Sequence, residues 1–323
     1  MKKVLLGLIS AMMITLFCGI SAMADGEINY GEYFDPAYVE VDGVKYGCIF
    51  DSRQKKLATI LEIETNNKEV EIPEYITYYG EKYKVETIVE IYLVDEGGED
   101  PSKGYRSRGS IEKLVLPNGI RIVDIEGWGW KNLKRIEVPA SVKCLDFNGY
   151  TRAKVIISPQ SKKYQSKGNG IYTNKGKRLV DTFGTKKTIN IAKGTTIIAN
   201  SAFNKNTSVE RVTMANTVKV IEDGKEPSGP FKAQSAFAGC KNLKTVVCSA
   251  NLQKIGKNAF KNCKSLSKIY INNIKQAPEI DKTAFKGAAK GIRFYVKNEK
   301  VAAQLNKNLK GSKAKGYKII VKR

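Results

Sequence analysis

The sequence contains no histidine. The commonest general base and the commonest metal ligand are therefore both missing, and a Ser-His-Asp or Cys-His catalytic arrangement is excluded. The one dense acidic cluster, residues 95–101 (DEGGEDP), carries the Gly and Pro of an exposed loop and lacks the ligand spacing of a calcium loop. No glycine-rich phosphate loop follows a strand. We therefore expect a protein that is not an enzyme and that holds no metal or cofactor.

Cysteine is sparse and scattered. Outside the N-terminal segment described below, the chain has an odd number of cysteines: Cys48, Cys144, Cys240, Cys248 and Cys263. No Cys-x-x-Cys pair occurs. A dense disulfide framework is therefore not expected.

Acidic residues are few relative to basic ones. The chain has 55 Lys and Arg against 32 Asp and Glu, a formal net charge of +23. Such a chain is attracted to polyanions. The alternative is that the charge only keeps the protein soluble.

Long apolar runs are missing except at the N-terminus. Lys2 and Lys3 precede an apolar run over residues 4–20, and Ala-Met-Ala follows at 22–24. This pattern is typical of a secretory signal peptide over residues 1–24, cleaved near Ala24. A lipoprotein signal would use Cys18, but the bulky Phe17 before it is unsuited to that motif. No later run is long enough to span a membrane.

A short phrase is repeated along the chain. The pair Ala-Phe occurs at residues 202–203, 236–237, 259–260 and 284–285, in steps of 34, 23 and 25. The longest step contains an insertion at 222–234, whose Gly and Pro predict a loop. Repetition at this period indicates stacked coils, so we expect the four Phe rings to form a buried spine on one side of the stack.

Alternating apolar residues also recur, which predicts strands with one buried face. The segments are 113–117, 135–139, 154–158, 188–192, 211–215, 245–249, 268–272 and 293–297. A strand this short cannot bury its face alone. We therefore expect the strands to stack into one continuous parallel sheet, as in a solenoid.

Cys240 and Cys263 occupy equivalent places in successive coils. Stacking would bring them near disulfide range. A small apolar side chain at an inward turn explains both without a bond, and we favour free buried thiols.

The segment LKTVVCSANLQKIGKNAFKNC at 243–263 resembles the BspA-like leucine-rich-repeat proteins of bacterial surfaces, and the resemblance covers about 109–296. The coils at 125–132, with Trp128 and Trp130, and at 145–153 depart from the pattern. The resemblance implies a leucine-rich-repeat solenoid: a curved parallel β-sheet with irregular return segments. It also implies a β-rich N-terminal cap over 25–108 and a hairpin insert over 158–180, turning at residues 174–176.

The tail at 297–323 departs from the repeat. Val301, Leu305 and Leu309 step by four, which predicts a helix that Gly311 ends, and residues 317–321 alternate as a last strand. We expect a short α/β C-terminal cap over 297–323. The nine basic residues from Lys297 onward are compatible with a second role in binding polyanions.

Between the buried positions of the strands lie two columns of outward residues. In the first, six of eight positions are basic, whereas Lys and Arg make up about one residue in six of the chain. The second places two tyrosines on neighbouring strands. The sequence-based candidates for ligand binding are Lys113, Arg135, Lys154, Arg211, Lys268, Arg293, Tyr270 and Tyr295. The alternative is a solvated sheet face that binds nothing.

The resemblance implies a secreted or cell-surface protein acting in binding or adhesion. We expect its partner to be an anionic polysaccharide or wall polymer, or a host or partner surface protein. The export signal argues against nucleic acid. The alternative is a structural component of the cell envelope held on the wall by its charge, since no sortase-type LPxTG tail is present. The oligomeric state is not indicated by the sequence.

Overall fold

A computed structural model describes residues 36–51, 56–89, 110–125, 130, 132–147, 151–173, 175–225 and 235–322. The signal peptide, the acidic cluster, Trp128, Asn174 and residues 226–234 of the insertion lie outside these ranges. The chain divides into two compact units, one up to Lys163 and one from Tyr164 onward.

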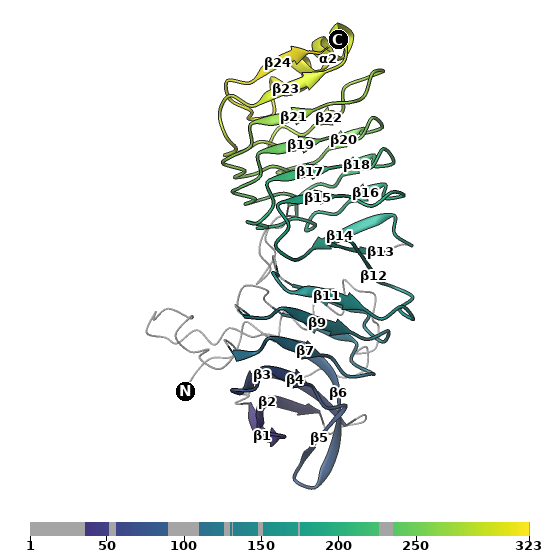
Figure 1. Cartoon of the computed structure of the whole chain (residues 1–323), viewed down its shortest axis with the longest axis vertical. Helices are drawn as coiled ribbons and strands as arrows, with labels where there is room; N and C mark the ends of the chain where they lie inside the picture. The colour runs from purple at the N-terminus through teal and green to yellow at the C-terminus, as the bar shows by residue number, and fades with distance from the viewer. Residues whose placement is uncertain are drawn as a thin grey trace. The chain divides into compact units, whose positions relative to one another are not determined.

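The first unit contains a mixed seven-stranded sheet (Figure 1). Its strands are β1 (Ala37–Val41), β2 (Val44–Asp51), β3 (Leu57–Glu64), β5 (Tyr75–Tyr78), β6 (Glu81–Val89), β8 (Ile122–Asp124) and β10 (Cys144–Asp146). The pairs β1–β2, β2–β3 and β5–β6 are antiparallel, whereas β3–β6, β6–β8 and β8–β10 are parallel. The antiparallel strands belong to the region expected to be a β-rich cap.

A second sheet in this unit is parallel and has the order β11-β9-β7-β4. Its strands are β4 (Glu69–Glu71), β7 (Lys113–Val115), β9 (Arg135–Val138) and β11 (Lys154–Ile157). Leu114, Ile136 and Val155 are buried, which confirms the first three predicted strands and their inward face. Each coil thus has a strand side, which contributes a strand to this sheet, and a return side. In this unit, β8 and β10 of the seven-stranded sheet lie on the return side.

The strand side of the second unit is a six-stranded parallel sheet (Figure 1). It consists of β15 (Thr188–Asn190), β17 (Arg211–Thr213), β19 (Thr245–Val247), β21 (Lys268–Tyr270), β23 (Arg293–Val296) and β24 (Lys318–Val321). Each of the other five predicted strands is confirmed.

The return side of the second unit is a seven-stranded sheet. Its strands are β12 (Gln165–Lys167), β13 (Gly170–Thr173), β14 (Arg178–Thr182), β16 (Ile197–Ile198), β18 (Val220–Ile221), β20 (Lys254–Ile255) and β22 (Glu279–Ile280). β13 and β14 form the predicted antiparallel hairpin. The return segments, expected to be irregular, contain two-residue strands that pair in parallel from coil to coil.

The prediction of one continuous strand-side sheet was wrong. Within the described ranges, no strand pairing links β11 to β15, and the eight predicted strands fall into two sheets. The reason lies in the chain between them: it folds back as β12, β13 and β14, and these strands join the return-side sheet.

The predicted phenylalanine spine is confirmed. Phe203, Phe237, Phe260 and Phe285 are at most 1% exposed. Successive ring centroids lie 4.6, 4.9 and 5.3 Å apart, with interplanar angles of 17°, 13° and 10°. Each ring therefore covers the next, and no coil of this unit buries its aromatic face alone.

A left-handed residue follows each Phe of the spine by two positions. The residues are Lys205, Gly239, Asn262 and Gly287, with φ between 56° and 72°. Gly and Asn adopt this conformation at the lowest steric cost, which explains their use at three of the four turns. The turn directs the next residue inward.

At two of these turns the inward residue is a cysteine. The Cys240 thiol donates a hydrogen bond to the Phe203 carbonyl oxygen at 2.9 Å, and the Cys263 thiol donates to that of Phe237 at 3.0 Å. Both thiols are free and fully buried, as predicted. Each one ties its coil to the preceding one through a backbone carbonyl.

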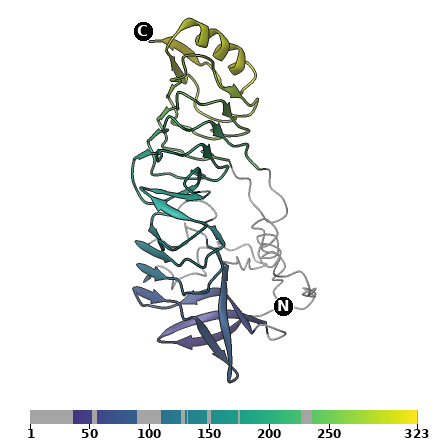
Figure 2. The same cartoon turned by 90° about the vertical axis from the view of Figure 1, so that its right-hand side faces the viewer.

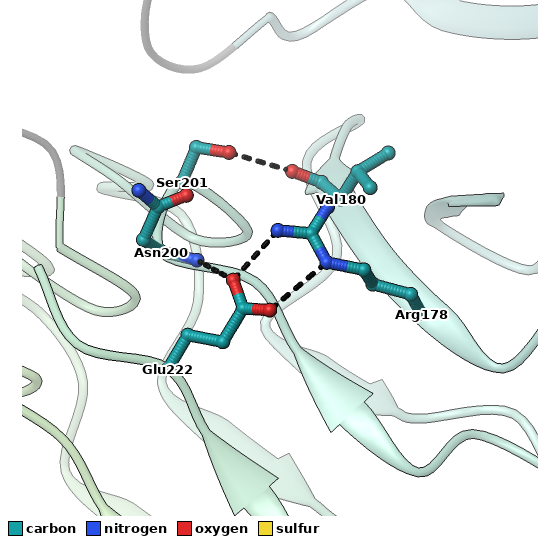
Figure 3. A network of polar contacts seen from close by, with 5 residues as sticks. All are labelled: Arg178, Val180, Asn200, Ser201 and Glu222. Atoms are coloured by element: carbon teal, nitrogen blue, oxygen red, sulfur yellow. Dashed lines mark hydrogen bonds and ion pairs between the residues drawn. The ribbon is translucent and has the colours of Figure 1, made fainter. Parts of the chain in front are cut away.

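A polar network joins three coils on the return side (Figure 3). The Arg178 guanidinium donates to both carboxylate oxygens of Glu222, at 3.0 and 2.6 Å. The backbone N–H of Asn200, in the intervening coil, donates to the same carboxylate at 3.3 Å. The Ser201 hydroxyl donates to the Val180 carbonyl oxygen at 2.9 Å. The bidentate geometry and the shared acceptor fix the register of β14, β16 and β18.

The predicted tail elements are confirmed. Helix α2 (Glu299–Leu309) begins after Asn298, whose side-chain oxygen accepts from the Val301 N–H at 2.9 Å. Val301, Leu305 and Leu309 are buried, and the helix packs against β22, β23 and β24 at the C-terminal end of its unit (Figure 2). The helix thereby covers the last coil, as a terminal element of a repeat array must.

In the part of the chain that the structure describes, no helix has the length and apolarity needed to cross a membrane.

Candidate functional site

The basic column of the second unit runs across the outward face of its strand-side sheet. Strand register places Thr188, Arg211, Thr245, Lys268, Arg293 and Lys318 side by side, one on each strand. The next residue on each strand points inward, as the burial of Val212, Val246 and Ile269 shows. Because neighbouring strands lie about 4.8 Å apart, the column spans roughly 20 Å from Arg211 to Lys318.

The charges of this column are available to a ligand. Arg211, Arg293 and Lys318 are exposed, and Lys268 is half-buried. Among the residues that the structure describes, no carboxylate forms an ion pair with any of these four. Lys268, Arg293 and Lys318 occupy three consecutive strands, where like charges repel each other. An anion bound across them would relieve that repulsion.

Two tyrosines lie beside the basic column. Tyr270 and Tyr295 pair across β21 and β23, and their rings are stacked at 4.7 Å and 14°. The Lys322 ammonium lies 4.9 Å from the Tyr295 ring centroid and 5.9 Å from that of Tyr270. The prediction that the two tyrosines are neighbours is confirmed. The two rings cover each other's faces and the Lys322 ammonium lies over Tyr295, so they form an aromatic cluster next to a line of cations.

The basic column of the first unit is partly neutralised. Register aligns Glu69, Lys113, Arg135 and Lys154. The Lys113 ammonium pairs with Glu69 at 3.0 Å, and Arg135 pairs with Glu137 at 2.9 Å. Two of the three predicted binding residues here therefore already have carboxylate partners, so the second unit is the stronger candidate.

A row of alternating charge borders the column in the second unit. The Glu210 carboxylate accepts from Lys244 at 2.7 Å and pairs with Lys187 at 3.1 Å. These two lysines, with Lys244 contributing most, hold the pKa of Glu210 below its usual range. Its one carboxylate is shared by the two lysines and offsets part of their charge, so the row contributes less to an anion site than the column beside it.

Sequence reasoning missed two residues of this face, Lys318 and Lys322. Both lie on or next to β24, which we assigned to the cap rather than to the sheet of repeats. Its alternating pattern was visible, but no repeat phrase aligned it with Arg293. Parallel pairing of β24 with β23 supplies that register. The cap strand thus extends both outward columns by one position.

The described residues give little support for metal binding or for a reactive thiol. No group of three or more Cys, Asp or Glu side chains there is placed to hold a metal ion. Burial raises the pKa of the Cys248 and Cys263 thiols to about 12 and that of Cys240 well above its usual value. A thiol with so high a pKa stays protonated and is a poor nucleophile.

Comparison with protein families gives one match. The family model of the BspA type leucine-rich repeat region matches residues 101–224 and 233–306, in six copies. These ranges contain most of the strands that form both outward columns. No curated protein matches the chain at a significant level.

Several solved structures are similar at low identity. The pneumococcal vaccine antigen PcpA is 14% identical with a TM-score of 0.38, covering 90% of this chain and 100% of that one. A leucine-rich repeat protein from Bacteroides ovatus is 17% identical with a TM-score of 0.40, covering 84% and 66%. A leucine-rich cell surface protein from Faecalibacterium prausnitzii is 14% identical with a TM-score of 0.34, covering 85% and 98%.

Proposed function

Because the chain belongs to the BspA-type leucine-rich repeat family, whose members are non-enzymatic repeat proteins typical of bacterial cell surfaces, we propose that it is an exported binding protein for an extended anionic polymer. The polymer, an acidic glycan or a wall polymer, lies across the outward face of β17, β19, β21, β23 and β24. The region over 109–296 forms the repeat array, between the caps at 25–108 and 297–323.

The observation that carries the proposal is the unpaired basic column beside the stacked tyrosines. Arg211, Lys268, Arg293 and Lys318 lack carboxylate partners within the described ranges, whereas ion pairs form on the equivalent sheet of the first unit and in the row that borders the column. A sugar unit of an extended polysaccharide is about as long as the strand spacing of roughly 4.8 Å. Acidic sugars can therefore meet the cations of neighbouring strands, while the stacked pair of Tyr270 and Tyr295 provides apolar contact beside them.

Charge reversal tests the proposal. The double variant Arg211→Glu, Lys268→Glu is expected to bind immobilised polygalacturonate or purified teichoic acid at least about tenfold more weakly than the wild type, a loss of about 1.4 kcal/mol. Two attractive contacts become repulsive in it, and the loss is largest at low ionic strength. Biolayer interferometry over a series of salt concentrations measures both effects.

The matched control carries the same change of net charge elsewhere. Lys264 and Lys286 are exposed residues of the turns that follow Cys263 and Phe285. The variant Lys264→Glu, Lys286→Glu is expected to bind within about threefold of the wild type, because these residues lie outside the column. Equal losses in the two variants would contradict a site on the sheet face and leave only non-specific attraction.

The net charge of +23 favours a second candidate function, a structural envelope component held electrostatically on the wall. The two functions differ in cell fractionation. A wall component retained by charge comes off progressively as the ionic strength of the wash rises, because salt screens its contacts. A released binding protein is found in the medium before any wash.

A further inference from the structure

The most exposed large hydrophobic side chain among the described residues is Tyr79, which is 89% accessible. It lies at the tip of the hairpin formed by β5 and β6, in the first unit (Figure 1). Register pairs Tyr78 with Glu81, so the turn has two residues, Tyr79 and Gly80. Their φ angles are 47° and 76°, the signature of a type I′ turn.

Tyrosine is an unfavourable residue at this position. Type I′ turns favour Asn, Asp or Gly at the first central residue, because a bulky side chain is strained at positive φ. The chain obeys this preference at Asp42-Gly43, the equivalent turn between β1 and β2, where φ is 51° and 71°. Strain of this kind, combined with full exposure of an apolar ring, points to a function rather than to folding.

The Tyr79 ring is supported by a chain of aromatic rings that leads back to the core. It packs edge-on against Tyr78, with centroids 4.4 Å apart and an angle of 63°. Tyr78 stacks on Phe50 at 4.5 Å and 7°, and Phe50 contacts the buried Tyr83 at 4.8 Å and 56°. Desolvation beside the neighbouring rings raises the pKa of the Tyr78 phenol. Four rings thus connect the core to the tip, and the exposed ring is preorganised.

The surroundings of the ring are polar and locally neutral. Lys56 forms an ion pair with Glu81, the residue opposite Tyr78. Thr77 and Lys82, on the other face of the hairpin, are exposed. The exposed large hydrophobic residues of this unit within the described ranges are all tyrosines: Tyr38, Tyr75 and Tyr79. No aliphatic side chain extends the tip into a larger apolar patch.

We propose that Tyr78 and Tyr79, with Lys56 and Glu81 at their edge, form a binding site for a neutral saccharide, separate from the anion-binding face. The apolar face of a pyranose ring stacks on Tyr79, and its hydroxyl groups exchange hydrogen bonds with the lysine and the glutamate. A stable protein interface needs roughly 800 Å² on each partner, much more than one hairpin tip provides. One or two sugar units match its size.

The decisive variant is Tyr79→Asn. Asn is favoured at this turn position, so the variant is expected to fold with an equal or higher unfolding midpoint. It nevertheless loses the ring. Binding of cellohexaose, chitohexaose and maltohexaose is measured by isothermal titration calorimetry. At least one is expected to bind the wild type, and that binding weakens at least about tenfold in Tyr79→Asn. Tyr79→Phe keeps the ring and stays within about threefold.

Two controls locate the effect. Tyr75→Asn removes a half-exposed ring of the same strand that lies outside the stack, and it is expected to leave saccharide binding unchanged. The variant Arg211→Glu, Lys268→Glu also keeps saccharide binding, so failure of this proposal is distinguishable from failure of the proposed function. The proposal is overturned if none of the three saccharides binds the wild type, or if Tyr79→Asn binds them as tightly. Capture of a surface protein through Tyr79, without saccharide binding, also overturns it.

Discussion

The variant Phe237→Ala is expected to lose about 3–5 kcal/mol of the free energy of unfolding. Its ring is fully buried and stacks on both sides, against Phe203 at 4.6 Å and Phe260 at 4.9 Å. Truncation removes the transfer free energy of the ring and leaves a cavity that two other coils line. Domains are stable by only about 5–15 kcal/mol, so the loss is a large part of the total.

Urea denaturation followed by circular dichroism measures this loss. Phe237→Leu is the matched control: it keeps most of the buried apolar volume and is expected to lose less than half as much. Tyr75→Ala, at a half-exposed ring outside the spine, is expected to change stability by no more than about 0.5 kcal/mol. A midpoint for Phe237→Ala equal to that of Tyr75→Ala would show that the spine does not hold the coils together.

Gly256→Ala is expected to lower the free energy of unfolding by about 3 kcal/mol, although it adds only one methyl group. This loss is similar to that of a large truncation in the core. A Cβ atom here would lie 2.4 Å from the carbonyl oxygen of Glu222, 2.5 Å from its carbonyl carbon and 2.6 Å from the nitrogen of Asp223. These are backbone atoms of the neighbouring coil and cannot swing away. Relief requires the two coils to separate, which weakens the hydrogen bond from the Gly256 N–H to the Ile221 oxygen at 3.0 Å.

Gly311→Ala is the control for this substitution. A Cβ atom there meets nothing within 4 Å, and the residue does not have a positive φ. The change is expected to be neutral or to stabilise by up to about 1 kcal/mol, because alanine has fewer unfolded conformations to lose. Thermal melts of the two variants compare the effects directly. If Gly256→Ala melts with the wild type, the close approach of the two coils is not a constraint on the fold.

The strand side and the spine were predictable from sequence because both repeat. Alternation identified strands such as those at 245–249 and 268–272, and the Ala-Phe pair aligned four rings that prove to be stacked. The two-residue return strands were not predictable, since alternation needs a longer segment to appear. The break between the two strand-side sheets was also missed: the hairpin insert was recognised, but its pairing with β16 depends on tertiary contacts.

The candidate site was predicted in part, for a related reason. The repeat register placed Arg211, Lys268 and Arg293 in one column, and the structure aligns them. It could not show that Lys113 has a carboxylate partner, because Glu69 lies on β4, outside the repeats that were aligned. Glu137, the partner of Arg135, lies on an aligned strand, but alignment does not show which way two long side chains of one strand turn. Lys318 and the hairpin tip at Tyr79 occur once each. A feature that occurs only once cannot be found by aligning repeats.

In an array whose units touch only their immediate neighbours, melting can start at an end and proceed one unit at a time. The clamp between Arg178 and Glu222 works against such stepwise loss: it reaches from β14 past β16 to the residue after β18, and Asn200 in the middle donates to the same carboxylate. The middle coil cannot detach without breaking a bond shared by all three. The coils of β14, β16 and β18 are therefore expected to unfold together, as one cooperative unit.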